Sequence, residues 1–487
     1  MKKILCFVII FILAFSPMTV LAAPYLSFTY NFWGQYVPAP AAYVPVMTIG
    51  AHDICETLGD FVNPSDMSSD RYGNIFVMDT GNNRVVIFDR GLNLINVINN
   101  FERDGQPDRF NNAQGIFVCA DQLIHVADTD NRRIVTLDME ANFIRQLYNP
   151  EIPDIEDDID FRPLRVLIGQ GGRIFVIVMH VFEGIMSFNR YGEFMGYFGT
   201  IAVRFNPVDM FWRSIATQAQ RERLRLFIPT EFLAMDLDEY GFVFATNRDR
   251  WGGDVIQRLN PRGNNVIVNF NSNVGISGTQ NFPWFGTLGG PSVLVDVSAR
   301  PYGKFSLLDS NRGRVYTYDS EGNLLYAFAG TGNIVGMGRR PVALETIGDS
   351  ILVLDGLRGQ IVYFEPTEYG RLINEAVSYR YRGNEPEAYL RWRRLLEIDE
   401  HFTLAHAGVG LSLLAQGENA LAREYLRRGM NLRYYSVALR RHRNDMLAEN
   451  LGSIFTGGLV AVLSLVGFRI YRRIKKKKDG AEGGAEE

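Results

Sequence analysis

One hairpin-like pattern recurs along the first three quarters of the chain, and this self-similarity constrains the fold more than any other feature. Residues 74–89 and 123–138 align as two short alternating strands around a polar turn, 49 residues apart. The pattern returns at 304–319 and 350–365, and weaker copies lie at 173–189 and 241–260. A small apolar strand precedes each copy, and a further strand follows most of them. Six four-stranded units repeated radially predict an all-β six-bladed propeller, an arrangement that leaves few open sheet edges.

The turn of the repeat carries the strongest local signature. Residues 79–85 read DTGNNRV, residues 128–134 read DTDNRRI, and residues 309–315 keep most of this pattern. Aspartate and asparagine can hydrogen-bond to the turn backbone, Gly81 can take a positive φ, and the arginine can pair across to a neighbouring blade. We therefore expect these side chains to determine the fold and not to act in catalysis. They are Asp79, Gly81, Asn83, Arg84, Asp128, Arg133, Asp309, Arg314 and Asp355.

This D-x-G-N-x-R hairpin resembles the NHL repeat, and the resemblance covers about residues 27–365. It is specific in the first two copies, fair in the fifth, and weak in the third and fourth, where Val178 and Thr246 stand near the place of the aspartate. The resemblance implies a six-bladed propeller. Metal-dependent lactonases share this architecture, but their ligand set cannot be placed on positions of this chain, and fold alone does not imply function.

The last blade needs a fourth strand from elsewhere in the chain. Its sequence changes to a helical pattern near Gly370, directly after the third strand. Residues 44–50 look like the fourth strands of other blades and precede the first blade. We expect this strand to close the ring, within a propeller domain spanning residues 23–366.

Residues 1–22 have the three parts of a secretory signal. Lys2 and Lys3 precede an apolar run, and a small-residue cleavage site ends at Ala22. An uncleaved N-terminal anchor is the alternative. Both interpretations send the following domain out of the cytoplasm.

A second apolar segment lies near the C-terminus. Residues 451–468 run for 18 residues without a charge, and seven basic residues follow within residues 469–478. This predicts a transmembrane helix over 451–471 and, by the positive-inside tendency, a cytoplasmic tail over 472–487. A buried core helix is the alternative. The expected topology is a single-pass cell-membrane protein with its N-terminal domain outside the cytoplasm.

Between the propeller and this segment, residues 367–450 show a helical period. Residues 383–388 and 417–422 are similar and lie 34 residues apart, with Ala405 and Gly410 at small positions where paired helices could approach closely. This resembles tetratricopeptide repeats, although a plain helical hairpin fits equally well. Either would form a spacer or a docking surface between the ring and the membrane.

Composition and motifs offer little support for catalysis. The net charge of −4 gives no reason to expect nucleic acid as a partner. We find no phosphate-binding glycine loop, H-E-x-x-H, paired C-x-x-C or G-x-S-x-G motif. Cys55 and Cys119 remain after signal removal and are expected as thiols, although one bridge is conceivable. No cofactor is identified. The acidic run 151–160 could take Ca²⁺ or another divalent cation, with a solvated loop as the alternative.

Long insertions fall on the propeller face that carries the repeat turns. They occupy residues 101–110, 151–160, 209–226, 248–254 and 271–290, and loops on a rigid scaffold often carry binding. The candidate contacts are Trp212, Trp251, Trp284 and Arg248. The sequence thus favours a membrane-anchored binding or scaffold module for a surface glycan, wall polymer or protein. The alternatives are a metal-dependent lactonase-like or other hydrolase with its site at the channel mouth, and an assembly partner for other membrane proteins.

Overall fold

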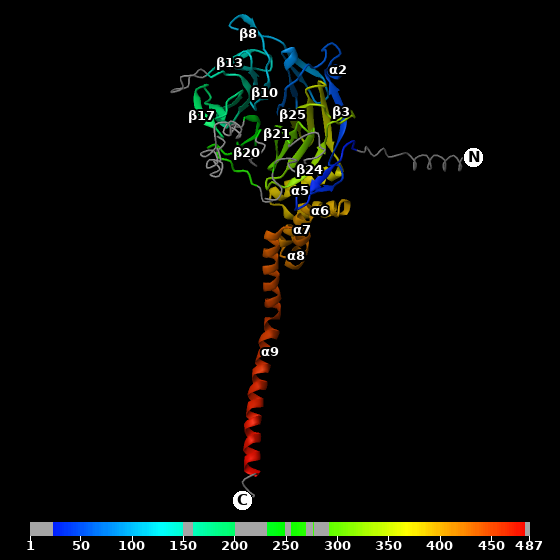
Figure 1. The fold of residues 1–487 in the computed structure, drawn as a ribbon, viewed down its shortest axis with the longest axis vertical. Helices are drawn as coiled ribbons and strands as arrows, with labels where there is room; N and C mark the ends of the chain where they lie inside the picture. Colours follow the sequence, from blue (N-terminus) through cyan, green and yellow to red (C-terminus); the bar gives the residue numbers. More distant parts are fainter. Residues whose placement is uncertain are drawn as a thin grey trace, which may run out of the picture.

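The protein was analysed as a computed structural model that describes residues 23–149, 159–199, 231–248, 255–268, 276 and 292–482. The expected signal segment 1–22 lies outside the described residues. Six antiparallel sheets are arranged around a common centre, and helices follow at the C-terminal side (Figure 1). The prediction of a six-bladed propeller followed by helices is therefore confirmed.

The first three blades each consist of four antiparallel strands in sequence order. Blade one comprises β4 (Asp66–Ser69), β5 (Ile75–Asp79), β6 (Arg84–Phe88) and β7 (Leu94–Ile98). Blade two comprises β10 (Gly115–Val118), β11 (Ile124–Asp128), β12 (Arg133–Leu137) and β13 (Phe143–Leu147). Blade three comprises β14 (Pro163–Ile168), β15 (Ile174–Val178), β16 (Ile185–Phe188) and β17 (Phe194–Phe198). A small hairpin of β8 (Phe101–Arg103) and β9 (Gln106–Asp108) projects between blades one and two.

The last three blades depart from this plan. Within the described ranges, blade four shows β18 (Phe232–Leu237), β19 (Val243–Asn247) and β20 (Ile256–Leu259). Blade five comprises β21 (Leu294–Arg300), β22 (Lys304–Asp309), β23 (Arg314–Tyr318) and β24 (Leu324–Ala329), extended by β1 (Phe28–Tyr30) and β2 (Tyr36–Pro38). Blade six comprises β25 (Pro341–Ile347), β26 (Ser350–Asp355), β27 (Gln360–Pro366) and β3 (Tyr43–Gly50).

The ring is closed by a strand from the other end of the domain. β3 pairs antiparallel with β27, with Ile49 opposite Ile361 and Tyr43 opposite Pro366. This is the arrangement that the sequence suggested for residues 44–50. The extension of blade five by β1 and β2 was not expected; it rests on the pairing of Phe28 with Ala327.

Apolar side chains fill the space between neighbouring blades. Phe76 and Ile87 of blade one pack with Ile116 and Val135 of blade two in one buried cluster. The middle strands of each blade are covered on both faces, which is why β5 and β6 read as continuous apolar runs and not as alternating ones. The innermost strands β10, β21 and β25 lie near the centre of the ring in Figure 1.

The signature turn of blade one refines the sequence interpretation. Arg84 Nε bonds Asp79 Oδ2 of its own hairpin at 2.7 Å, and its Nη groups donate to the carbonyls of residues 58–60, in the connection from blade six to blade one. Asp79 Oδ1 accepts the N–H of Val62, in the segment that leads into β4. Asn83, with φ 52°, is the left-handed residue. Gly81 is needed for space, because a Cβ there would lie 2.5 Å from the carbonyl oxygen of Val62.

The other signature turns use the aspartate in the same way. Asp128 accepts the N–H of Asn111 and bonds Arg133 Nε at 2.9 Å. Asp309 and Asp355 likewise accept N–H groups of the segments that enter β21 and β25. Arg314 instead lies over the ring of Phe28, 5.0 Å from its centroid. In blade four the register places Asn247, one residue beyond Thr246, opposite Phe232 at the signature position.

Five helices follow the propeller. They are α5 (Glu368–Tyr381), α6 (Glu385–Ile398), α7 (Thr403–Gln416), α8 (Asn419–Arg428) and α9 (Leu432–Glu482). Thr367 caps α5 by accepting the N–H of Gly370, and Gly417 ends α7 with φ 86°. Each helix packs against the next one along the chain. Gly410 permits this approach, since a Cβ there would lie 2.6 Å from Leu426. Tetratricopeptide-like and plain helical packing both fit this arrangement.

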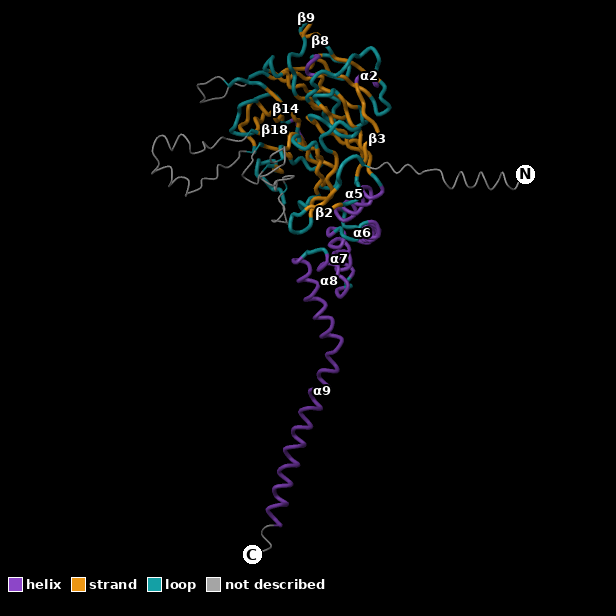
Figure 2. Tube along the Cα trace, turned by 45° about the vertical axis from the view of Figure 1, so that its right-hand side comes forward, coloured by secondary structure: helices purple, strands orange, loops and turns teal. Residues whose placement is uncertain are grey.

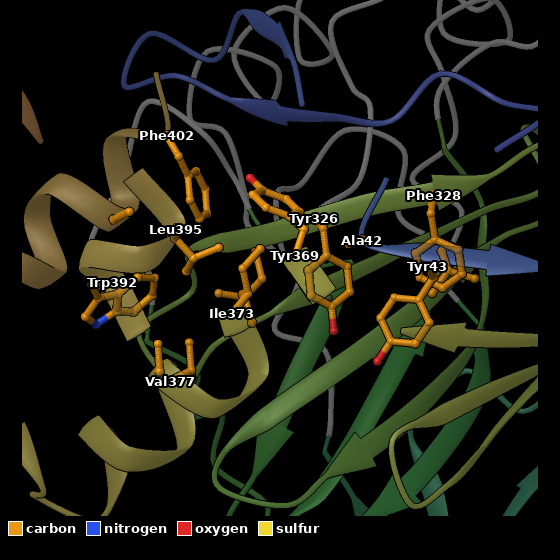
Figure 3. Packing of buried hydrophobic residues seen from close by; sticks show 14 of the residues in the cluster. Ala42, Tyr43, Tyr326, Phe328, Tyr369, Ile373, Val377, Trp392, Leu395 and Phe402 are labelled. Carbon is orange, nitrogen blue, oxygen red and sulfur yellow. The ribbon is translucent and has the colours of Figure 1, made fainter. Parts of the chain in front are cut away.

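The helices and the propeller share one hydrophobic core. Figure 3 shows Tyr43 and Phe328 of the outer strands of blades six and five on one side, and Trp392 and Phe402 of the helical segment on the other. Tyr43 and Phe328 stack with ring centroids 4.8 Å apart. Because this core is continuous, we infer that the helical segment is held in a fixed position against the propeller.

A buried polar network also crosses this joint. Asn374 of α5 donates to the hydroxyl of Tyr43 and accepts from that of Tyr326. Arg300 donates to both tyrosine hydroxyls, and Lys304 Nζ donates to Ser378 Oγ at 2.6 Å. Burial, assisted by Arg300, lowers the pKa of Lys304 to about 7.

The last helix is long and largely free of packing. α9 runs without a break for 51 residues and extends away from the propeller (Figure 2). It contains a segment with mean hydropathy 2.0, none of which is buried, and by length and composition it could cross a membrane. The predicted span 451–471 lies inside this helix, which continues through the basic residues to Glu482.

Candidate binding site at the channel mouth

The innermost strands place ionisable side chains around the propeller axis. Asp66, Arg165 and Asp296 each pair with the residue that directly precedes the signature position on the neighbouring strand. They therefore lie at the same register position of blades one, three and five. We call this position the upper level of the channel. In blades two, four and six the same level holds small residues, namely Gly115, Ala234 and Ala343.

Two more carboxyl groups lie one level below, two residues after Ala234 and Ala343 on the same strands. They belong to Asp236 of blade four and Glu345 of blade six. Each bonds an N–H of the following blade: Asp236 accepts from Ala299 at 2.7 Å, and Glu345 accepts from Ser69 at 3.1 Å. The upper level does the same, because Asp66 accepts from Ile116 and Asp296 from Leu344. These carboxyl groups thus link adjacent blades around the ring.

Burial raises the pKa values of these channel carboxyl groups. Desolvation raises the pKa of Asp296 to about 8 and that of Asp236 to about 6. It also raises the pKa of Glu345 well above its ordinary value, with Asp236 as the next cause, and raises that of Asp66 against the opposing effect of Arg165. Asp296 is therefore largely protonated at neutral pH, which reduces repulsion between the channel carboxyl groups.

A cavity of about 710 Å³ opens above the upper level, on the face that carries the signature turns. Its lining includes the segments entering the innermost strands and the first residues of those strands. All six blades contribute, through Ser65, Gln114, Arg165, Leu233, Val295 and Arg340 in ring order. The cavity is the mouth of the propeller channel on this face.

Two arginines supply the charge of this mouth. Arg165 donates from Nη1 to the carbonyl of Gln114 at 2.7 Å and from Nη2 to that of Ser65 at 3.3 Å, so it ties blade three to blades one and two. Its Nε is buried without a partner. Arg340 donates from Nη2 to Asn63 Oδ1 and to the carbonyl of Gly356.

The predicted contact residues fall only partly within the described structure. Trp212, Trp251 and Trp284 lie outside the described residues. Arg248 is exposed directly after β19, and its backbone N–H bonds the carbonyl of Glu231. It does not line the cavity.

The segments that carry the tryptophans nevertheless join the described chain near the mouth. Residues 200–230 lead into β18, where Leu233 lines the cavity. Residues 277–291 lead into β21, where Val295 lines it. Two of the three tryptophans therefore belong to segments that end beside the mouth.

No group of three His, Cys, Asp or Glu side chains in the described ranges is placed to hold a metal ion. Most of the acidic run 151–160 lies outside these ranges; its last residue, Asp160, forms an ion pair with Arg162. Cys55 and Cys119 are both unpaired thiols.

The sequence interpretation missed the channel residues. Asp66, Arg165 and Asp296 are ionisable residues inside short, otherwise buried strands, and that pattern was the available signal.

A second cavity of about 550 Å³ lies where the helices meet blade five. It is lined by the turn between β23 and β24, by residues next to β1, and by α5, α6, α7 and the start of α9. Trp392 forms part of its wall, and the indole N–H of this residue has no partner. This surface belongs to the joint between propeller and helices.

Comparisons with known proteins add neither a family nor a function to this architecture. No protein family matches the sequence, and no curated protein matches it. The resemblance to the NHL repeat thus stays a prediction.

Solved structures resemble this chain only weakly and at very low identity. Virginiamycin B lyase from Staphylococcus aureus is 8% identical, with 66% of this chain and 99% of that chain covered and a TM-score of 0.41. A Bacteroides thetaiotaomicron protein of unknown function is 9% identical, with 63% and 70% covered and a TM-score of 0.41. The PQQ-bound aldose sugar dehydrogenase from Streptomyces coelicolor is 13% identical, with 67% and 99% covered and a TM-score of 0.35. Likenesses this weak carry no argument about fold or function.

Proposed function

We propose that this chain is a membrane-anchored binding module whose propeller is displayed outside the cytoplasm. The channel-mouth face recognises a surface ligand: a glycan, a wall polymer or a protein. The observation that carries this proposal is the cavity of about 710 Å³ to which every blade contributes. A cavity of this size on a rigid ring is suited to selective binding.

The helical segment supports the anchoring role. α9 still contacts the preceding helices at Asp445, whose carboxylate accepts a bond from Asn419 Nδ2 at 2.7 Å. The apolar run begins at Leu451, only six residues later, which is about 9 Å of helix. In the proposed arrangement the helices α7 and α8 lie close to the membrane surface, and the continuous core of the joint carries the propeller with them.

The test is capture of a ligand from cell-envelope extract by the immobilised protein. We expect simultaneous replacement of Trp212, Trp251 and Trp284 by alanine to weaken capture by roughly 2 kcal/mol or more per true hot spot, with unchanged thermal unfolding. Trp33→Ala is the matched control, because Trp33 is 64% exposed but lies beside the extra strands of blade five.

Two results would count against the proposal. Equal capture by the triple variant and the wild type would mean that the wrong face was chosen. Turnover of an extract component that is abolished by a chelator would favour the metal-dependent hydrolase instead. That enzyme would depend on the channel carboxylates more than on the tryptophans.

A further inference from the structure

The charged side chains that line the mouth cavity are of one sign within the described ranges. They are Arg165 and Arg340, and no carboxylate lines the cavity with them. Each retains donor capacity: Arg165 Nε is buried without a partner, and Arg340 uses only Nη2 in bonds to described residues. A ligand in the cavity can accept bonds from Arg340 Nε and Nη1, and from the second N–H of Arg165 Nη2, whose bond to a described residue goes to the Ser65 carbonyl.

The two arginines come from opposite sides of the ring. Arg165 lies on β14 of blade three, and Arg340 directly precedes β25 of blade six. The innermost strands contact each other in ring order, so blades three and six face each other across the channel. A group bound at the mouth can therefore be approached by a guanidinium from each side.

The carboxyl groups beneath the mouth only partly oppose this charge. Asp66 Oδ2 lies 3.6 Å from Arg165 Nη1, and Asp296 occupies the same level of the ring. Burial raises the pKa of both groups, that of Asp296 to about 8. Arg340 has no carboxylate partner in the described structure, because its bonds go to an amide oxygen and a carbonyl oxygen. Arg340 therefore contributes a positive charge to the mouth that no described carboxylate opposes.

We propose that the mouth cavity binds an anionic ligand, whose carboxylate or phosphate group is held between Arg165 and Arg340. Guanidinium groups form charge-assisted and often bidentate bonds with these oxyanions. The volume of about 710 Å³ suits a small molecule or the end group of a larger one. This inference rests on the proposed function, since it names the ligand class of the same face.

Arg340 is the residue to change. Arg165 bonds carbonyl groups of blades one and two, so its loss would loosen the ring. Arg340 is exposed and can be replaced by glutamine with little effect on packing. Arg339→Gln is a matched control: it removes the same charge one residue away, from an exposed side chain that bonds Asn333 and does not line the cavity.

The experiment is isothermal titration of the full-length protein in detergent with three probes. They are trigalacturonate, its fully methyl-esterified neutral form, and tripolyphosphate. We expect the wild type to bind one of the two anions and not the ester, with affinity that falls as salt is added. Arg340→Gln should weaken this binding at least about tenfold, while Arg339→Gln leaves it unchanged. The anion that binds distinguishes a carboxylate from a phosphate.

Three results would overturn the inference: equal binding of the ester, no binding of either anion, or undiminished binding by the Arg340→Gln variant with an unchanged unfolding midpoint. In each case, tryptophan-dependent capture from envelope extract would still support the proposed function. Loss of that capture alone, with Arg340-dependent anion binding intact, would show that the tryptophan face is wrong and that the mouth is right.

Discussion

At the scale of single residues, the signature turn shows how little of a side chain's role follows from its type. Asp79 serves the hairpin and also the incoming segment, through its bonds to Arg84 and to the N–H of Val62. The sequence predicted a structural role for these residues, and their described bonds connect segments of the propeller. Some of their partners lie in the segment that leads into the same blade, which a local pattern does not reveal.

Gly81 provides a direct test of this steric interpretation. A Cβ at this position would lie 2.5 Å from the Val62 carbonyl oxygen, a backbone atom that cannot move away alone. We expect Gly81→Ala to lower the free energy of unfolding by about 1–3 kcal/mol, measured by urea denaturation. Gly50→Ala is the control, because Gly50 has φ −94° and the nearest atom to its Cβ would be 3.5 Å away. Equal effects of both changes would contradict the assignment.

The channel carboxyl groups predict a pH dependence. The folded pKa values of Asp296, about 8, and Asp236, about 6, lie above the value of about 3.9 for an unfolded aspartate. Such groups favour folding below the unfolded pKa, and the contribution is lost as pH rises through the folded values. In the channel, Asp66, Glu345 and Arg165 also lie near Asp296 and Asp236. We expect the urea midpoint to fall between about pH 4 and about pH 8, and to fall less in the Asp296→Asn variant. An equally steep fall in that variant would exclude Asp296 as the source.

At the scale of elements, the closing strand is the most consequential. β3 supplies the outer strand of blade six and also Tyr43, which joins the core shared with the helices. The strand pattern of residues 44–50 was visible in the sequence because it matches other fourth strands. The added strands β1 and β2 were not, because three-residue strands have too short a pattern to recognise.

Removal of β3 should expose an unpaired edge on β27. We expect deletion of residues 43–50 from the full chain to produce aggregation in size-exclusion chromatography, since an unpaired edge invites other chains. Deletion of residues 27–38 is the comparison, because it removes β1 and β2 but leaves the four other strands of blade five and the pairing of β3 with β27 in place. A monomeric product with unchanged thermal stability after loss of β3 would show that blade six does not require it.

At the scale of the whole molecule, the propeller, the helical segment and α9 form one connected body. The hydrophobic core runs from the outer strands of blades five and six through α5, α6, α7 and α8 to Ala438 of α9. A helix without a break then joins this core to the apolar segment. The position of the propeller relative to a membrane would therefore follow from the position of α9.

The orientation across the membrane can be measured in intact cells. Seven basic residues within 469–478 favour the cytoplasm for the C-terminal side. We expect a tag placed after Glu487 to be protected from added protease, while the propeller is cleaved. A tag inserted directly after Pro24 provides the opposite control, and the added protease should remove it. An accessible C-terminal tag would reverse the proposed orientation.

The sequence alone determined the repeat, the order of the strands within a repeat, the strand that closes the ring and the apolar C-terminal segment. Each of these depends on a periodic pattern of polarity, which is local in the chain. Only the tertiary structure decided that Asp66, Arg165 and Asp296 meet at one level, and that Arg340 faces Arg165 across the mouth. A strand's own pattern separates its two faces, but closure of the ring decides which groups from different blades become neighbours. That closure pairs residues more than 300 positions apart, such as Ile49 with Ile361, beyond the reach of any local pattern.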